Sequence, residues 1–300
     1  MATNNTTLPY KWPAHVFTVE ASIIITINGV LVVFIVSRKV LRSNPSTIFF
    51  LNLLISHVAE GIAAMWFEHN LTRENFVAQG RSENALIKVF TASLLLGCLS
   101  YIPYTADRLV AIRWPLFYQT LTKKKVILIC IQPWLFSLFF LLTLQLFHFP
   151  KETGDVVAII LVSIMSLVLI ISNTIIYRVV LKHVKEIKKT TVGVENIDKT
   201  DREKIKSRHE KIEKRRMRSV YICSGIVVSY IVCWAPHMIH DIIKMTNIDS
   251  TIVGARSHWP KITLVVAFLN PIIDPLIWIS LNRRIKKEIK SCFYNSTFVS

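Results

Sequence analysis

The sequence predicts an all-α membrane protein, a seven-transmembrane helix bundle followed by a short amphipathic eighth helix. Composition is the first reason, because 52% of the 300 residues are apolar and only 18% are charged. The mean hydropathy is +0.45, and only 8 glycines and 11 prolines interrupt the chain. A soluble domain with this balance could not cover its surface with polar side chains, so the composition indicates a lipid environment.

Seven apolar segments have the length that a membrane crossing requires. A helix needs about 20 residues to span a hydrocarbon core of ~30 Å at ~1.5 Å per residue. Glu60, Glu68 and Glu83 interrupt the outer ends of the second and third segments, which are the weakest of the set. The segments are residues 17–38, 47–68, 83–108, 124–148, 155–181, 218–244 and 259–281.

The end of the chain differs in pattern from the spans. Leu281, Ile285, Ile289 and Phe293 recur every four residues with basic residues between them, which predicts an amphipathic helix on a membrane surface. We therefore divide the chain into an extracellular N-terminus (1–16), a seven-helix domain (17–281), and the amphipathic helix with a cytoplasmic tail (282–300). The charged connection 182–216 cannot form a core, and we expect it to extend the flanking helices into water or to be mobile.

The basic residues predict the orientation of the bundle. Eight lysines and arginines fall on the side of the N-terminus, which leaves 28 of the 36 on the other side. Because basic residues collect on the cytoplasmic side, we expect a multi-pass plasma-membrane protein with an extracellular N-terminus. The net charge of +17 is then explained by the basic residues that set the orientation in the membrane, and we expect no nucleic-acid partner. The eight outer residues are Lys11, Arg73, Arg81, Lys88, Lys151, Lys244, Arg256 and Lys261.

Sequons and cysteines fit this arrangement. Asparagine sequons at Asn4, Asn5 and Asn70 would face outward, where N-glycosylation occurs, and one at Asn295 would face inward. The five cysteines include no CxxC pair, so we expect neither a zinc site nor a disulfide framework. We expect no metal and no cofactor; a retinal protein would need a lysine in the middle of the last span, and Lys261 stands near its outer end.

Three ordered motifs lie in the later spans. Asp107 and Arg108 begin the run DRLVAIRWPLFY at the inner end of the third span. The run CWAP in the sixth span contains Trp234 and Pro236, and this proline predicts a kink because it removes a backbone hydrogen bond. Asp274 lies between two prolines in the seventh span, and an ionisable residue in mid-membrane predicts a functional site.

On these residues the sequence resembles a rhodopsin-like (class A) G-protein-coupled receptor over roughly residues 17–293. DRLVAIRWPLFY is similar to the family's DRYxAIxxPLxY, CWAP to its CWxP, and NPIIDPLIW to its NPxxDPLIY. Asn28, Asn52-Leu53 and Trp134 resemble its asparagine of helix one, NL of helix two and tryptophan of helix four. One such motif would be weak evidence, whereas the ordered set is strong.

The resemblance implies roles for the inner-end residues. Arg108 would engage a heterotrimeric G protein, restrained by Asp107 in the inactive state, and Tyr177 would meet Arg108 on activation. Trp234 and Pro236 would form the switch at the pocket floor. The cytoplasmic faces at 113–125 and 182–218 would contact the G protein, and arrestin is a further candidate partner.

The same resemblance places an inner polar network in the bundle and a lipid anchor after it. Asn28, His57 and Asp274 would form the network, with Pro275 beside Asp274. Cys292, which follows the amphipathic stretch, stands where the family often carries a palmitoyl group, and membrane lipids are expected partners. A free thiol at Cys292 is the alternative.

Several departures from the family pattern bear on the subfamily. The helix-three position of the family's outer disulfide is Glu83, the loop HFPKETGD has no cysteine, and the fifth span has no proline in its middle. This combination most resembles the branch of melanocortin, adenosine and cannabinoid receptors, although the ligand pattern of melanocortin receptors is incomplete. Leu109 and Trp278 replace family tyrosines, which removes two hydroxyl groups from the activation network.

The most unusual departure is His57, which replaces the second-helix aspartate that usually holds sodium in this family. An imidazole cannot replace a carboxylate as a ligand of a hard cation, so we expect little or no sodium modulation. His57 and Asp274 would form a buried pair with coupled ionisation. Two interpretations stay open: a neutral histidine with one helix–helix hydrogen bond, and a proton-sensitive switch.

The ligand is predicted only by class. Phe90 stands where amine receptors carry an aspartate, so we expect a non-aminergic ligand, either a peptide or a small apolar, lipid-like molecule. Acidic residues at the outer rim suit a cationic peptide, whereas a short second outer loop suits lateral entry of a lipid. The rim candidates are Glu60, Glu83, Asp155, His240 and Asp241, and the apolar floor comprises Phe90, Leu94, Trp234 and Phe268.

Other protein classes fit less well. An intramembrane metalloprotease needs HExxH, but His209-Glu210 is followed by Glu213 within the charged loop. Asp274 has no partner aspartate in mid-span, so we expect no enzymatic activity. A seven-helix channel or transporter without G-protein coupling is the alternative, although no internal repeat is visible. Ionic current or substrate flux that survives loss of Arg108 would favour it.

Overall fold

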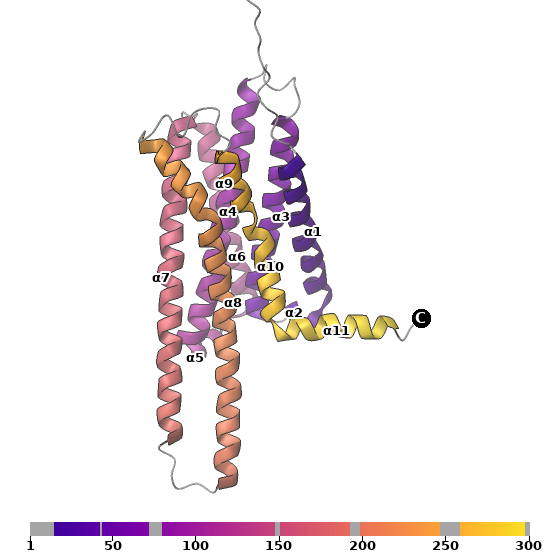
Figure 1. The fold of residues 1–300 in the computed structure, drawn as a ribbon, viewed down its shortest axis with the longest axis vertical. Coiled ribbons are helices and arrows are strands. Elements are labelled where there is room, and N and C mark those ends of the chain that lie inside the picture. The colour runs from indigo at the N-terminus through magenta and orange to yellow at the C-terminus, as the bar shows by residue number, and fades with distance from the viewer. Residues whose placement is uncertain are drawn as a thin grey trace, which may run out of the picture.

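The computed structural model describes the backbone of residues 15–42, 44–71, 80–147, 151–192, 199–246 and 259–297. These residues form a bundle of long helices with short helices at some of the connections (Figure 1). In chain order the helices are α1 His15–Ser37, α2 Lys39–Arg42, α3 Pro45–Leu71, α4 Gly80–Arg113, α5 Pro115–Gln119, α6 Lys123–Leu146, α7 Lys151–Val192, α8 Lys199–Thr246, α9 Trp259–Phe268, α10 Asn270–Leu281 and α11 Arg283–Thr297.

Seven stretches of the described chain are long and apolar enough to cross a membrane, so the predicted seven-span bundle is confirmed. They follow the predicted segments closely. The third span is the largest difference, because α4 continues past Arg108 as far as Arg113. The stretches are Val16–Ser37, Pro45–Asn70, Ala85–Arg113, Lys123–Leu146, Ile159–Lys182, Met217–Ile243 and Ile262–Leu281.

Two features at the inner end were also predicted. Most of the charged connection 182–216 continues the flanking helices, because α7 runs to Val192 and α8 begins at Lys199; Figure 1 shows both helices continuing beyond the rest of the bundle. The helix α11 lies crosswise to the bundle. Its Ile285 is buried while the neighbouring Arg284 and Lys286 are exposed, as an amphipathic helix requires.

The seventh span is broken into α9 and α10 by the sequence around Pro271. Proline has no N–H to donate, so the helical hydrogen bond from position 271 back to Ala267 cannot form. The Leu269 N–H instead bonds the Val266 carbonyl oxygen at 3.3 Å, a tighter turn than in an α-helix. After this break, both Asn270 and Asp274 are buried in the bundle.

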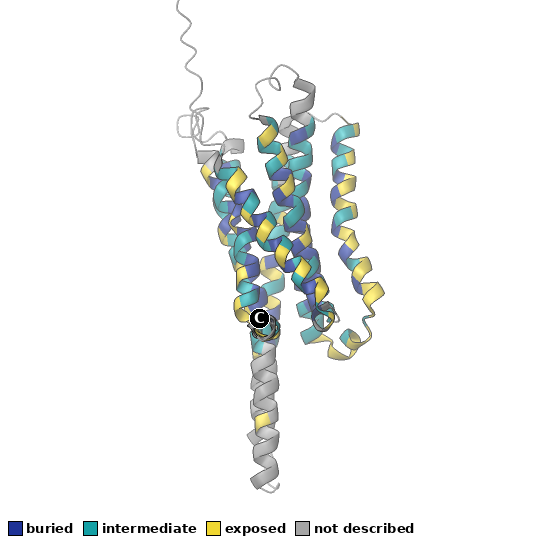
Figure 2. Ribbon diagram, turned by 90° about the vertical axis from the view of Figure 1, so that its right-hand side faces the viewer, coloured by how far each residue is buried: buried dark blue, intermediate teal, exposed yellow. Residues whose placement is uncertain are grey.

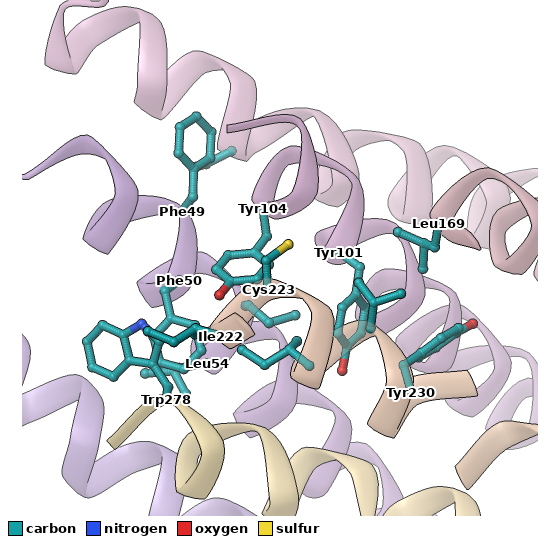
Figure 3. Packing of buried hydrophobic residues seen from close by; sticks show 14 of the residues in the cluster. Phe49, Phe50, Leu54, Tyr101, Tyr104, Leu169, Ile222, Cys223, Tyr230 and Trp278 are labelled. Atoms are coloured by element: carbon teal, nitrogen blue, oxygen red, sulfur yellow. The ribbon is translucent and has the colours of Figure 1, made fainter. Parts of the chain in front are cut away.

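Aromatic packing fills the inner half of the bundle. Phe50 of α3 stacks on Trp278 of α10 with ring centroids 4.1 Å apart, and its centroid lies 5.8 Å from that of Tyr104 of α4. Figure 3 shows these rings together with Cys223 of α8, so side chains of four helices meet there. Trp278, which replaces a family tyrosine, is thus a packing residue with a buried ring.

The outer surface of the bundle is apolar where it would face lipid. On α6 and α7, large hydrophobic side chains are exposed over much of the helix. In the view of Figure 2, exposed positions likewise recur beside buried ones along the helices. Phe139 and Leu167, for example, are 67% and 57% exposed. Such surfaces would be unstable in water, so they agree with a membrane-spanning bundle.

We predict that Gly61→Ala destabilises the bundle by about 1–3 kcal/mol, because α1 packs directly against Gly61. A Cβ atom at Gly61 would lie 2.9 Å from Ile25 Cγ1 and 3.3 Å from the Ala21 carbonyl oxygen. Gly29→Ala is the matched control, since a Cβ atom there meets nothing within 4 Å. Melting temperatures of the purified variants in one detergent check the prediction, and equal values for the two variants would contradict it.

Candidate functional site

A polar cluster in the middle of the bundle is centred on Asp274 of α10. Its Oδ1 atom accepts a hydrogen bond of 2.7 Å from the Ser229 hydroxyl of α8. Its Oδ2 atom accepts one from the Tyr101 hydroxyl of α4 and lies 3.4 Å from His57 Nε2 of α3. The sequence suggested the His57–Asp274 contact, and the structure adds two further helices to it.

Glu60 belongs to this cluster and not to the outer rim, where the sequence analysis placed it. It lies one turn above His57 on α3, is buried, and its Oε2 atom is 3.4 Å from His57 Nδ1. Gly97 of α4 makes room for the carboxylate, because a Cβ atom at Gly97 would lie only 2.9 Å from Glu60 Oε2. The ring of His57 is therefore flanked by a carboxylate on each side.

Asn270 and Asn28 connect this cluster to the rest of the bundle. The Asn270 side-chain amide donates to the Tyr101 hydroxyl, and its carbonyl oxygen lies 3.2 Å from the Ser229 hydroxyl. On α1, the Asn28 amide donates to the Pro271 carbonyl at 3.0 Å. The helical donor to this carbonyl would be the N–H of residue 275, which is a proline, so Asn28 satisfies a backbone acceptor that Pro275 leaves free.

A separate hydrogen bond joins two residues that resembled family positions. Trp134 Nε1 of α6 donates to Asn52 Oδ1 of α3 at 3.0 Å. Neither residue is ionisable, so their pairing was not predicted from the sequence. The bond joins α6 to α3.

At the inner end of α4, Asp107 and Arg108 form a second polar centre. Arg108 Nε lies 3.4 Å from Asp107 Oδ2, which is an ion-pair distance, but the two atoms do not have hydrogen-bond geometry. The Arg108 guanidinium donates to the Ser219 hydroxyl of α8 at 2.8 Å and lies over the Tyr104 ring at 5.6 Å. In this packing Arg108 thus joins α4 to α8.

Tyr118 of α5 holds the aspartate from the other side. Its hydroxyl donates to Asp107 Oδ1 at 2.7 Å and lies 2.9 Å from the Ser46 hydroxyl of α3. Burial and then the charge of Asp107 raise the pKa of Tyr118 above its ordinary value, so this phenol remains a donor at neutral pH. The inner connection between α4 and α6 is thereby fixed to the bundle.

The other residues expected to act in activation lie apart from Arg108. Tyr177 is 48% exposed on α7, and the described contacts of Arg108 are with α4 and α8. Trp234 is buried, with its ring centroid 6.1 Å from those of Tyr230 and His237. Pro236 and Pro275 lie inside α8 and α10 without ending them.

The outer half is lined by aromatic rings from four helices. The Phe90 ring stacks on Phe67 with centroids 4.8 Å apart and on Phe268 at 6.0 Å, and Phe17 meets Phe268 edge-on at 6.3 Å. Leu94 packs beside them. Three of the four expected floor residues, Phe90, Leu94 and Phe268, therefore lie together, whereas Trp234 belongs to the larger buried cluster with Tyr230.

Two further residues of the expected outer rim, Asp241 and His240, are described by the structure. Asp241 Oδ2 lies 3.6 Å from His237 Nε2. His240 is buried, and its Nδ1 atom has no hydrogen-bond partner among the described residues. The side chains of Glu83 and Asp155 lie outside the described residues.

The modification candidates are only partly described. Asn70 stands at the outer end of α3, with its amide donating to the Trp66 carbonyl at 2.7 Å. Asn4, Asn5 and the side chain of Cys292 lie outside the described residues. The cysteines that the structure describes are unpaired and buried: Cys98, Cys130, Cys223 and Cys233. Within the described chain, no group of three or more His, Cys, Asp or Glu side chains is arranged to hold a metal ion.

Tyr101, Ser229 and Gly97 belong to the cluster but were not predicted from the sequence. Tyr101 could have been found from the sequence. Gly97, Tyr101, Tyr104 and Arg108 recur at spacings of three and four residues and so share one face of α4. Ser229 carried no such signal. A serine in an apolar helix is common, and only the approach of α10 shows its partner.

Comparison with known proteins agrees with this architecture. A family model described as "7 transmembrane receptor (rhodopsin family)" matches residues 27–278. A crystal structure of squid rhodopsin superposes with a TM-score of 0.71 at 13% sequence identity, over 93% of this chain and 84% of that one. At that identity the likeness shows the fold alone.

Two curated relatives match over short stretches. The annetocin receptor of Eisenia fetida is 25% identical over 81 residues, which are 27% of this chain and 19% of the relative. The C3a anaphylatoxin chemotactic receptor of Cavia porcellus is 23% identical over 84 residues, 28% of this chain and 18% of the relative. The matched stretches thus span less than a fifth of either relative.

We predict that Gly97→Ala destabilises the protein only while Glu60 is present, because the added methyl group would displace the Glu60 carboxylate from His57. In a double-mutant cycle with Glu60→Ala, the coupling should be about 0.5–3 kcal/mol. Melting temperatures of the four proteins measure it. A zero coupling, with both single variants folded, would show that the two residues do not interact.

We also predict that sodium leaves the protein's stability unchanged, since the site between Asp274 and Glu60 is filled by an imidazole ring. Melting temperatures in NaCl and in KCl at equal ionic strength should agree. His57→Asp is the informative variant, because three carboxylates would then face one another and a cation should raise its melting temperature. A sodium-dependent rise in the wild type would refute the prediction.

Proposed function

Because the chain belongs to the rhodopsin family of seven-transmembrane receptors, we propose that it transmits binding of an extracellular ligand to heterotrimeric G proteins. In this proposal the bundle has two helix packings, and a ligand acts by shifting the population between them. The family is one of receptors and not of enzymes, and the spans make the chain a multi-pass membrane protein.

The observation that carries the proposal is the hydrogen bond between Arg108 and Ser219 at the inner end of the bundle, together with the unsatisfied polar atoms beside it. Arg108 links α4 to α8 through a single serine hydroxyl, a contact that an outward movement of α8 would break. Three buried polar atoms beside it lack hydrogen-bond partners: Tyr104 Oη, Asp107 Oδ2 and Arg108 Nε. Buried polar groups are normally satisfied, so this cluster favours rearrangement or contact with a partner.

The proposal extends to topology. We place the N-terminus outside the plasma membrane, with residues 1–16 extracellular and the extensions of α7 and α8 in the cytoplasm. The excess of basic residues on the α7–α8 side supports this orientation. Glycans on Asn4, Asn5 and Asn70 and a palmitoyl group on Cys292 would agree with it, and arrestin would bind the same inner face.

For the ligand we propose a non-aminergic peptide or small lipid-like molecule. The position expected of an amine-binding aspartate is Phe90, which the structure places in a stack of phenylalanine rings. We further propose kinship with the melanocortin, adenosine and cannabinoid branch. Support comes from α7, which has no proline, and from the short connection between α6 and α7.

We predict that Arg108→Ala abolishes G-protein activation while leaving the protein at the cell surface. The guanidinium is the group that α8 releases, and no other described side chain supplies a cation at that position. The measurement is nucleotide exchange on a panel of Gα subunits in membranes containing the receptor. Arg38→Ala is the matched control, because Arg38 lies on the first inner connection, with its guanidinium 5.9 Å from the Phe34 ring centroid.

If the Arg108→Ala variant activated G proteins as fully as the wild type does, the proposal would be overturned. So would ionic current or solute flux that appears in the wild type and survives the substitution, because that result indicates a channel or transporter.

A further inference from the structure

We propose that His57, Glu60 and Asp274 form a proton-binding site, in which a proton on the imidazole ties α3 to α10 and stabilises the helix packing seen here. The inference deepens the proposed function, since it names a second ligand of the receptor, H⁺, and the side chains that take it up. It depends on the receptor assignment only for its effect on signalling.

The hydrogen-bonding capacity of the three side chains is the first argument. Nδ1 of His57 faces Glu60 and Nε2 faces Asp274, each at 3.4 Å. A neutral imidazole has one N–H, so one carboxylate would then face a ring nitrogen lone pair. A protonated ring has an N–H on both sides: Nδ1 can donate to Glu60, while Nε2 lies at ion-pair distance from Asp274 and 3.5 Å from the Tyr101 hydroxyl.

The hydrogen bonds of Asp274 make the second argument. It accepts from Ser229 on one oxygen and from Tyr101 on the other, beside His57. A carboxylate is an acceptor on both oxygens, whereas a carboxylic acid has to donate from one of them. Its partners are therefore those of an ionised Asp274.

Burial makes the proton necessary. The side chains of His57, Glu60 and Asp274 are 1%, 4% and 0% exposed, so water does not screen them. Two carboxylates in such a place without a cation would repel each other and lose their hydration. The imidazolium is the cation that the described chain places between them.

The titratable groups that face this site come from each neighbouring helix. They are Glu60 from α3 itself, Cys98 and Tyr101 from α4, Tyr230 from α8 and Asp274 from α10. From α1, the Asn28 amide bonds the Pro271 carbonyl of α10 and does not titrate. Thiols and phenols titrate ordinarily near pH ~8.5 and ~10, so imidazole and carboxyl groups dominate between pH 6 and 8.

The direction in which pH changes the stability follows from the contacts that the protonated His57 makes. The proton stabilises a packing in which α3, α4, α8 and α10 meet at Asp274, with Arg108 bonded to Ser219 at the inner end. Raising the pH removes the proton and weakens this packing. Stability should therefore fall, and basal signalling should rise, as the pH increases from 6 to 8. One linked proton changes the equilibrium by at most about tenfold per pH unit.

The primary experiment measures the melting temperature of the purified full chain between pH 6 and 8, which needs no G protein. The wild type should melt at lower temperature as the pH rises, and His57→Asn should show a clearly shallower fall, since the other histidines still titrate. His240→Asn is the matched control, because His240 is also buried but no carboxylate pairs with it in the described contacts. It should follow the wild type. Parallel profiles for wild type and His57→Asn would overturn the proposal.

If His57→Asn does not fold, Glu60→Gln gives the same test with a nearly isosteric change. With one carboxylate left, the fall in melting temperature should begin at a lower pH than in the wild type, and an unchanged profile would overturn the proposal. Basal nucleotide exchange at the same pH values completes the design. A pH-dependent stability together with nucleotide exchange that survives Arg108→Ala would refute the proposed function and leave the proton site standing.

Discussion

The constraint on which the rest of the structure depends is the placement of Asp274 in a bundle whose outside is apolar. A charged group within a membrane has to find its partners inside the protein. Here they come from three other helices: His57 of α3, Tyr101 of α4 and Ser229 of α8. The break at Leu269, which Pro271 imposes, turns the helix so that Asp274 and Asn270 are both buried.

The inner end is connected to this cluster through two helices. On α4, Tyr101 and Arg108 are seven residues apart, which is about 10 Å along the helix. On α8, Ser229 and Ser219 are ten residues apart, or about 15 Å. The two helices are thus joined at two levels, directly by Arg108 and Ser219 and indirectly through Asp274. α4 contains Pro103 between Tyr101 and Arg108, whereas α8 has no proline between Ser219 and Ser229, so we expect a change at Asp274 to reach Ser219 along α8.

Much of this arrangement could be predicted from residue types alone. The lengths of apolar segments predict the seven spans, because hydrocarbon thickness fixes helix length, and a four-residue spacing predicts α11. Asp274 and His57 could be paired because each is an ionisable residue in an apolar span. Glu60 could not be placed, because its position near a span end suited a rim residue equally well. Its place beside His57 depends on the packing of α4 against α3, where Gly97 leaves room for the carboxylate.

The central claim, that the contacts of Asp274 hold α8 close to α4, is tested most directly by a distance between their inner ends. Spin labels on Arg113→Cys and Tyr221→Cys would report it, since both native side chains are exposed. The described native cysteines are buried, so Cys292 is the one that needs replacement by serine. The account predicts one short distance in this labelled protein and an added longer population after Asp274→Ala. An unchanged distribution in folded Asp274→Ala protein would contradict it.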